Sequence, residues 1–259
     1  MDYPKSSVYS DVFPCGYVSE DGEVYTEFTV KELTGVEEDI LASNMDEVEK
    51  MGQVIGNCLV NVKNENNVID DHAQLIKISR QMPMADRLAA ILATRIVSLG
   101  DKFSFKIQCA SKSCNNVDQA YIMLSSLEKT QMKNPEKQIR EDEFADGKTI
   151  EWHILRPQDM KWLEKARKKM KKKKDMTLMI LSRVDKIDGV EIQRQGAKLK
   201  DSIRVLQSLS IGERNSIRNL FREKEGDIDL DINHECSVCG HEFTQRLELT
   251  EDFFFPSGE

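Results

Sequence analysis

The stretch HECSVCGHEF, residues 234–243, contains the most specific motif of the sequence, because Cys236 and Cys239 have the C-x2-C spacing of a metal-binding knuckle. Apolar and polar residues alternate before it, which predicts a half-buried strand that ends at Cys236. Gly240 lacks a Cβ atom and suits the positive-φ bend of a knuckle, and Phe243 begins a predicted return strand. Two thiolates supply only half of a tetrahedral zinc site, so a second pair is expected elsewhere.

That second pair lies in FSFKIQCASKSC, residues 103–114, where Cys109 and Cys114 have C-x4-C spacing. Apolar and polar residues alternate up to Cys109, so this pair also follows a predicted half-buried strand. Two strand-borne pairs form a four-cysteine tetrahedron, which zinc accepts with Zn–S distances of about 2.3 Å. The predicted Zn²⁺ ligands are Cys109, Cys114, Cys236 and Cys239. Four thiolates leave no open position for water, so the predicted zinc is structural.

Other uses of these cysteines are open. A redox C-x-x-C motif normally begins a helix, whereas an alternating strand follows this one. Disulfides belong to oxidising compartments, and no apolar N-terminal stretch resembles a signal peptide. His234 or His241 could replace one thiolate as a ligand. Cys15 and Cys58 have no partner at a useful spacing and are expected to be ordinary thiols.

An internal repeat appears when Cys109 is aligned with Cys236. ADRLAAILATRIVSLGDKFSFKIQC then falls on GERNSIRNLFREKEGDIDLDINHEC, and each segment reads as a helix followed by a strand that ends in cysteine. The second helix is predicted to begin at Ser210, with Glu213 completing a capping box, and to end at Gly226. Upstream, each half has an Asp-Gly turn, an alternating strand and a helix.

The repeat predicts the domain organisation. The fold class is α+β, with two divergent tandem copies of hairpin, helices, strand and half-knuckle, joined by a zinc-ribbon-like four-cysteine site. Residues 1–128 form the predicted N-terminal copy, residues 129–146 a polar linker, and residues 147–259 the C-terminal copy. The alternative is that two unrelated α+β segments resemble each other by chance.

Charge and hydropathy limit the function classes. The net charge of −8 argues against a general nucleic-acid coat, and no run approaches the ~20 apolar residues of a membrane helix. Residues 156–174 differ from the rest, with ten Lys or Arg and two Asp or Glu. Lys168, Lys171 and Lys172 are the residues expected to dock on an acidic partner. A solvated helix end or contact with nucleic acid are the alternatives.

The aromatic run near residue 254 is the second candidate partner surface. Phe253, Phe254 and Phe255 are consecutive and cannot all face one side of a strand. At least one is therefore expected to point away from the core and to bind a partner protein. The alternative is that all three wedge between the two copies.

No catalytic constellation emerges from the sequence. His72 and His153 stand without a nucleophile or a carboxylate at a telling spacing, and a Gly-rich phosphate loop is not found. We therefore expect a binding or assembly protein, not an enzyme, without a small-molecule substrate.

The order of several short motifs resembles a known family. FPCGY, VEEDIL, NCLV, MPMADRLAAILATRIVSLGDKFSFKIQC, CSVCGHEF and FFFP are similar, in this order, to the baseplate hub assembly proteins of T-even-type contractile-tailed phages. Two features depart from that family's pattern. Ala85 stands where glycine usually precedes Asp-Arg, and C-x4-C replaces a C-x2-C first knuckle.

The resemblance implies a role in building the tail baseplate, as a chaperone or as a structural subunit. It implies other baseplate or hub proteins as partners, the host cytoplasm as the place of assembly, and the virion tail baseplate if the protein is retained. The competing hypothesis is a zinc-ribbon adaptor that binds nucleic acid through the Lys-rich helix, although the acidic net charge makes nucleic acid the less favoured partner.

Overall fold

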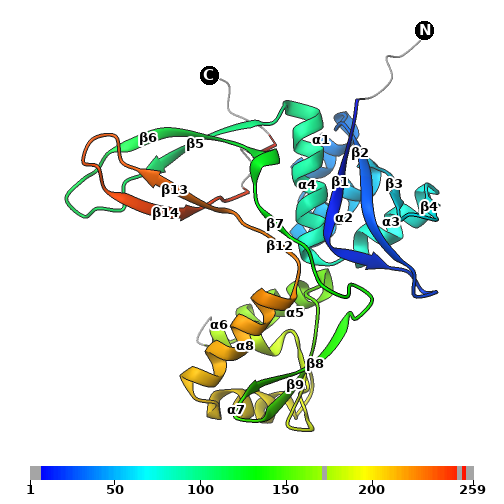
Figure 1. Cartoon of the computed structure of the whole chain (residues 1–259), viewed down its shortest axis with the longest axis vertical. Coiled ribbons are helices and arrows are strands. Elements are labelled where there is room, and N and C mark those ends of the chain that lie inside the picture. The colour runs from blue at the N-terminus through cyan, green and yellow to red at the C-terminus, as the bar shows by residue number, and fades with distance from the viewer. Residues whose placement is uncertain (1–6, 171–173, 250–252, 255–259) are drawn as a thin grey trace.

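The computed structural model describes residues 7–170, 174–249 and 253–254. It is an α+β structure with two lobes and a projecting arm made of two hairpins (Figure 1). In this view the first lobe lies at the right, the second lobe at the bottom, and the arm at the left. No helix among the described residues is both long enough and apolar enough to span a membrane.

The first lobe is an antiparallel sheet of order β1-β2-β3-β4, covered by helices. Side-chain caps at Thr34, Asp46 and Asp71 satisfy free backbone N–H groups where three of the helices begin. The elements are β1 (Val8–Val18), β2 (Val24–Lys31), α1 (Gly35–Ala42), α2 (Glu47–Cys58), β3 (Leu59–Lys63), β4 (Val68–Ile69), α3 (His72–Gln81) and α4 (Met84–Leu99).

The second lobe repeats this plan. Its antiparallel sheet has the order β8-β9-β10-β11 and is also covered by helices. The elements are β8 (Ile139–Ala145), β9 (Lys148–His153), α5 (Pro157–Lys169), α6 (Asp175–Leu181), β10 (Val184–Ile187), β11 (Val190–Glu191), α7 (Leu199–Ser208) and α8 (Ile211–Lys224). Both lobes therefore run strand, strand, helix, helix, strand, strand, helix, helix, with the same strand order in the sheet.

After its last helix each lobe sends a hairpin into the arm. The first hairpin is β5 (Lys102–Gln108) and β6 (Val117–Met123), followed by the short 3-10 helix η1 (Leu124–Ser126). The second hairpin is β13 (Asp231–Glu235) and β14 (Glu242–Arg246). β7 (Lys129–Thr130) pairs with β12 (Asp227–Ile228) where the arm meets the lobes.

Residues 129–146, predicted as a polar linker, contain β7 and the whole of strand β8. Met132 and Phe144 in this segment are buried in the second core, and the Met132 amide donates to the Pro14 carbonyl at 2.7 Å. The polar composition of the segment reflects the exposed face of an edge strand, whose alternate side chains point to solvent. Sequence composition alone could not distinguish such a strand from a linker.

The helix predicted to begin at Ser210 is confirmed, because Ser210 and Glu213 form the reciprocal capping box of α8. Gly226 has a different role from the predicted C-terminal cap, because α8 ends in an extended Glu225. A Cβ atom on Gly226 would lie 2.1 Å from the Pro14 carbonyl oxygen. Glycine is needed here because the backbone of β1 crosses this point.

The apolar side chains form two cores. The first core fills the first lobe and includes Ile228, Leu230 and Leu247 from the C-terminal part of the chain. The second core fills the second lobe and includes Cys15 from β1. Each lobe is thus completed by residues from the other half of the sequence, so the two halves are interlocked.

The phenylalanines near the C-terminus belong to the first core. Phe253 is fully buried and Phe254 is 8% exposed. The Phe253 ring packs edge-on against Phe103 with centroids 5.2 Å apart. The expectation that these two side chains bind a partner is therefore corrected, because both are already buried within the chain. Phe255 lies outside the described residues.

Candidate metal centre

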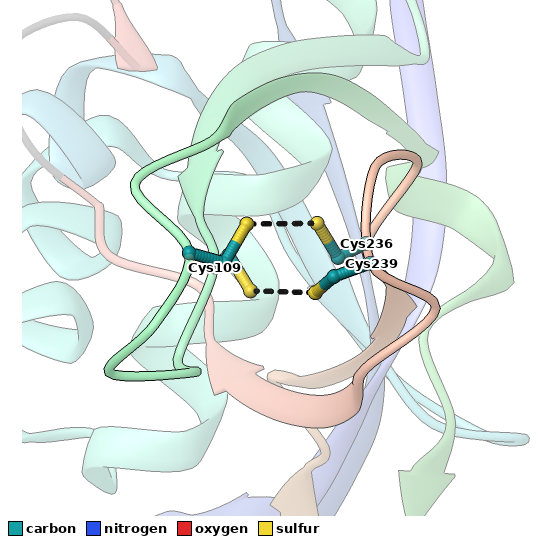
Figure 2. A group of neighbouring side chains, drawn as sticks. Cys109, Cys236 and Cys239 are labelled. Atoms are coloured by element: carbon teal, nitrogen blue, oxygen red, sulfur yellow. Dashed lines mark hydrogen bonds between the residues drawn. The ribbon is translucent and has the colours of Figure 1, made fainter.

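Two hairpin loops bring the four predicted ligands together. Cys109 follows β5 and Cys114 lies in the loop before β6, whereas Cys236 follows β13 and Cys239 lies in the loop before β14. Their four Sγ atoms all lie within 4.8 Å of one another. Figure 2 shows Cys109 facing Cys236 and Cys239 across the gap between the loops.

The Sγ separations fit a tetrahedral metal. Cys109 and Cys239 are 3.7 Å apart, and Cys114 and Cys236 are 3.9 Å apart. A zinc tetrathiolate with Zn–S near 2.3 Å has edges of about 3.8 Å. A disulfide needs about 2.05 Å between sulfurs, and all four cysteines are free thiols in this structure. The geometry therefore favours a shared cation over cross-linking.

The C-x2-C loop has the local geometry of a knuckle. Gly240 has a φ of 66°, and its amide donates to the Cys236 carbonyl at 2.9 Å. This confirms that the position needs the positive φ that glycine adopts without strain. The Cys236 amide in turn donates to the His241 carbonyl at 3.0 Å, which closes the loop onto the start of β14.

The longer C-x4-C loop reaches a comparable arrangement. The Cys109 amide donates to the Asn116 carbonyl at 2.9 Å, which closes the base of the loop. The Cys114 amide donates to the Ser111 carbonyl at 3.0 Å, which folds the two extra residues into a turn. The Ser111 amide points at the Cys109 sulfur at 3.5 Å. The extra residues are thus absorbed without moving Cys114 away from the site.

The thiols do not ionise equally. The backbone amides of Cys239 and Val238 lower the pKa of the Cys236 thiol. At Cys109 the Ser111 amide acts in the same direction, but burial and the neighbouring thiols prevail and raise the pKa. Clustered thiolates repel one another, so a divalent cation at the centre would favour the ionised form of all four.

Neither nearby histidine belongs to this ligand group. His234 directs Nε2 to the Asp118 carboxylate at 2.9 Å. His241 is exposed and stacks on Phe243, with ring centroids 5.9 Å apart. The donor set offered to a metal is therefore four sulfurs, which is a set that zinc prefers in structural sites.

Asp118, which the sequence patterns did not single out, joins the two loops. It lies on β6 of the first hairpin, and its Oδ2 accepts from His234 Nε2 and from the Ser237 amide at 3.1 Å. Its Oδ1 accepts from the Ser237 hydroxyl and from Asn116 Nδ2. These bonds from Ser237 and His234 hold the pKa of Asp118 well below its usual range. No spacing rule connects residue 118 with residue 237, so only the three-dimensional structure reveals this link.

His153 has carboxylate neighbours that its sequence context did not indicate. Its Nδ1 lies 2.7 Å from Asp185 Oδ2, and its Nε2 lies 3.2 Å from Asp159 Oδ1. These partners come from β10 and α5 of the second lobe. Because Arg194 also pairs with Asp185 at 2.8 Å, the group forms an ion-pair network that ties the lobe together.

The predicted basic surface is only partly described. Lys168 is exposed and pairs with Glu164 on the same helix at 2.5 Å. Arg167 pairs with Asp175, the first residue of α6. Lys171 and Lys172 lie outside the described residues. Lys161 also pairs with Glu49, whereas Lys165, Lys169 and Lys174 make no ion pair among the described residues, so the described charges of this segment are only partly neutralised.

Comparison with known proteins gives one family. The family model described as T4 bacteriophage base plate protein matches residues 18–255, which include all four cysteines of the site. Neither the curated proteins nor the solved structures contain a match to this chain. Because the match covers most of the chain, the protein belongs to the T4 bacteriophage base plate protein family.

Proposed function

We propose that this chain is a non-enzymatic protein of baseplate hub assembly, acting as a chaperone or as a structural subunit and stabilised by one structural zinc ion. The observation that carries the proposal is the convergence of four Sγ atoms within 4.8 Å, two from each hairpin, in a member of a baseplate family. All four coordination positions would be taken by protein, which suits a structural role and not catalysis.

The zinc in this proposal clamps two tandem copies. The same order of strands and helices in both lobes supports this view, as does the hairpin that follows each last helix. Residues 1–128 and 147–259 would be the two copies, each contributing two ligands. Because the ligand pairs belong to opposite halves, metal binding energy would stabilise the contact between the halves.

The partners in this proposal are other baseplate or hub proteins, met in the host cytoplasm during assembly. Retention in the virion tail baseplate would make the protein a structural subunit, and release would make it a chaperone. Membrane, small-molecule and nucleic-acid partners have no place in this role.

The experiment measures both the zinc content of the protein and the proteins that co-purify with it. Tagged protein is purified from infected cells without chelator, its zinc is measured by elemental analysis, and co-purifying proteins are identified by mass spectrometry. The expected result is one zinc per chain together with baseplate proteins. The same measurement on finished virions separates a subunit from a chaperone. Zinc-free protein would contradict the metal, and the lack of baseplate partners would contradict the role.

The alternative, a zinc-ribbon adaptor that binds nucleic acid through the Lys-rich helix, predicts different behaviour. It requires retention on heparin that collapses with modest salt, and a gel shift of nonspecific DNA. Arg167 and Lys168 are engaged by Asp175 and Glu164, so a phosphate would have to compete with these carboxylates at two of the basic residues.

A further inference from the structure

A groove with a volume of about 670 Å³ lies between the lobes. It is lined by residues of α2, α4, α6 and α8 and by the end of the second hairpin. Its floor is apolar and includes Met51, Leu88, Ile91, Phe221 and Leu249. A concave apolar surface of this size is typical of a binding site.

Three arginines at the groove have no strong partner. Among the residues that the structure describes, Arg222 makes no hydrogen bond or ion pair, and Arg218 contacts only Asn215 on its own helix. Arg246 reaches Asp231 at 3.5 Å, with both side chains more than half exposed. Arg218 and Arg222 are four residues apart on α8, where like charges destabilise a helix. Arg222 lies in the last turn of α8, where a positive charge is favourable to the helix dipole, so helix stability leaves only the position of Arg218 unexplained.

The carboxylates that line the groove are already engaged. Glu225 pairs with Arg183, and Glu47 pairs with Lys50 at 2.8 Å. Asp227 accepts from the amide of the following residue at 2.8 Å. The lining contains five arginines and three carboxylates, so its net charge is positive, although the whole chain has a net charge of −8.

The first half of the chain shows what an arginine at this position can hold. Arg95, which aligns with Arg222, donates from Nε to the Phe253 carbonyl at 2.8 Å. Its guanidinium also lies 5.9 Å from the centroids of the Phe103 and Phe253 rings. Arg95 on α4 thus binds the segment around Phe253 of the same chain. Its counterpart Arg222 on α8 binds no such segment among the described residues.

We propose that the groove binds an acidic, apolar segment of another baseplate protein, with apolar side chains on the floor and carboxylates on Arg218, Arg222 and Arg246. Charge complementarity carries the choice of occupant, since guanidinium groups bind carboxylates in paired hydrogen bonds. The inference rests on the proposed function and names the kind of segment that the chain would hold in the baseplate or its precursor.

The chemistry of the groove is tested with 8-anilinonaphthalene-1-sulfonate, a probe that joins an apolar aromatic body to a negative charge. The full chain carrying R218Q, R222Q and R246Q is compared with a control carrying K198Q, K200Q and R204Q, which removes the same charge from exposed positions around α7. The groove variant is expected to weaken probe binding about tenfold. The control is expected to change it by less than about twofold. An equal effect of both variants overturns the inference.

The occupant is tested by photo-cross-linking. Benzoylphenylalanine replaces Met179, which lines the groove and is 45% exposed, or Val190, which is 52% exposed and does not line it. Complexes from infected cells are irradiated, and the linked peptide is sequenced. The expected product is an acidic, apolar peptide of a baseplate protein, linked at Met179 and not at Val190.

The outcomes separate this inference from the proposed function. Co-purification of baseplate proteins without a link at Met179 overturns the groove and leaves the function standing. A link at both positions, to the chain itself, to a lipid or to a nucleic acid also overturns it. Loss of all baseplate partners before irradiation contradicts the function instead, and the inference then fails with it.

Discussion

Helices α4 and α8 occupy equivalent places in the two halves of the chain but use their aligned residues in opposite ways. Asp86 on α4 is fully buried and accepts from the Cys15 amide at 2.7 Å. Its counterpart on α8, Glu213, caps its own helix and pairs with Lys148 near the surface. The aligned carboxylates thus have different roles: Asp86 binds the backbone of β1, and Glu213 caps the start of α8.

The aligned arginines differ in the same direction. Arg95 is 4% exposed and donates a hydrogen bond to the Phe253 carbonyl, whereas Arg222 is exposed at the groove. In the first half both polar side chains point inward and bind other parts of the chain. In the second half Glu213 is used to cap its own helix, and only Arg222 is exposed and available to other molecules.

The largest expected effect comes from removing one cysteine of the proposed zinc site between the two hairpins. Cys236→Ser is expected to abolish stoichiometric zinc and to lower the free energy of unfolding by about 5 kcal/mol or more, because the binding energy of a structural metal is folding energy. Elemental analysis and chemical denaturation measure both quantities.

The matched control is Cys58→Ser, which changes a buried thiol in the first core that is not a ligand. It is expected to retain one zinc per chain while losing some stability. Equal zinc loss in both variants would show that global unfolding, and not a lost ligand, removes the metal.

The next largest effect is expected at Phe253, whose side chain is buried in the first core. Phe253→Ala is expected to lower the free energy of unfolding by about 3–5 kcal/mol, because a fully buried ring leaves a cavity against Phe103. Zinc content is expected to stay at one per chain. Phe243→Ala, at a half-buried position of β14, provides the comparison and is expected to cost less. A negligible effect of Phe253→Ala would mean that the first core does not depend on this segment.

Asp86 provides a smaller effect that depends on pH. Burial raises its pKa to about 7, against the amides of Cys15 and Gly16 and with help from the charge of Glu225. The folded state therefore holds the proton more tightly than the unfolded state. The resulting stabilisation is complete below about pH 4 and is lost as the pH rises through about 7, by roughly 2–4 kcal/mol.

Asp86→Asn removes the titrating group but keeps an oxygen acceptor for the Cys15 amide. Its free energy of unfolding is expected to match the wild type near pH 4 and to exceed it near pH 8. Denaturation curves at both values provide the measurement. A parallel pH dependence of the two proteins would show that Asp86 ionises normally in the fold.

The smallest expected effect concerns the link between the two loops. Asp118→Asn retains the shape of the side chain but removes the charge that His234 and Ser237 share. Zinc affinity is expected to fall about 10- to 100-fold, as for other groups that orient a metal site, while the fold persists. Competition with a chromogenic chelator measures the affinity. Asp231→Asn, an exposed carboxylate on β13, is the control and is expected to leave zinc affinity unchanged.

Local sequence patterns predicted correctly those features of the fold that depend on neighbouring residues in the chain. The alternation before Cys109 and Cys236 predicted the strands that carry them, and the Ser210 capping box predicted where α8 begins. The four cysteines could be grouped because each pair begins at the end of such a strand. The α+β class followed from the same patterns.

What could not be predicted depends on contacts between distant segments. Phe253 and Phe254 looked like a partner surface because nothing in the sequence states that Phe103 and Arg95 receive them. Gly226 looked like a helix cap because the crossing of Pro14 is a tertiary fact. The groove arginines were likewise invisible as a group, since they come from α8 and from the end of β14.

The interlocked cores also fix the order of events during synthesis. Ile228 and Phe253 complete the first core, although the helices and strands that they cover are made much earlier. On the ribosome, the first lobe must therefore wait with part of its apolar surface uncovered until residues 228–254 have emerged. A chain terminated before residue 228 would lack both this cover and Cys236 and Cys239, which are half of the candidate metal site. Such a fragment would leave apolar side chains of the first core open to solvent and to proteases.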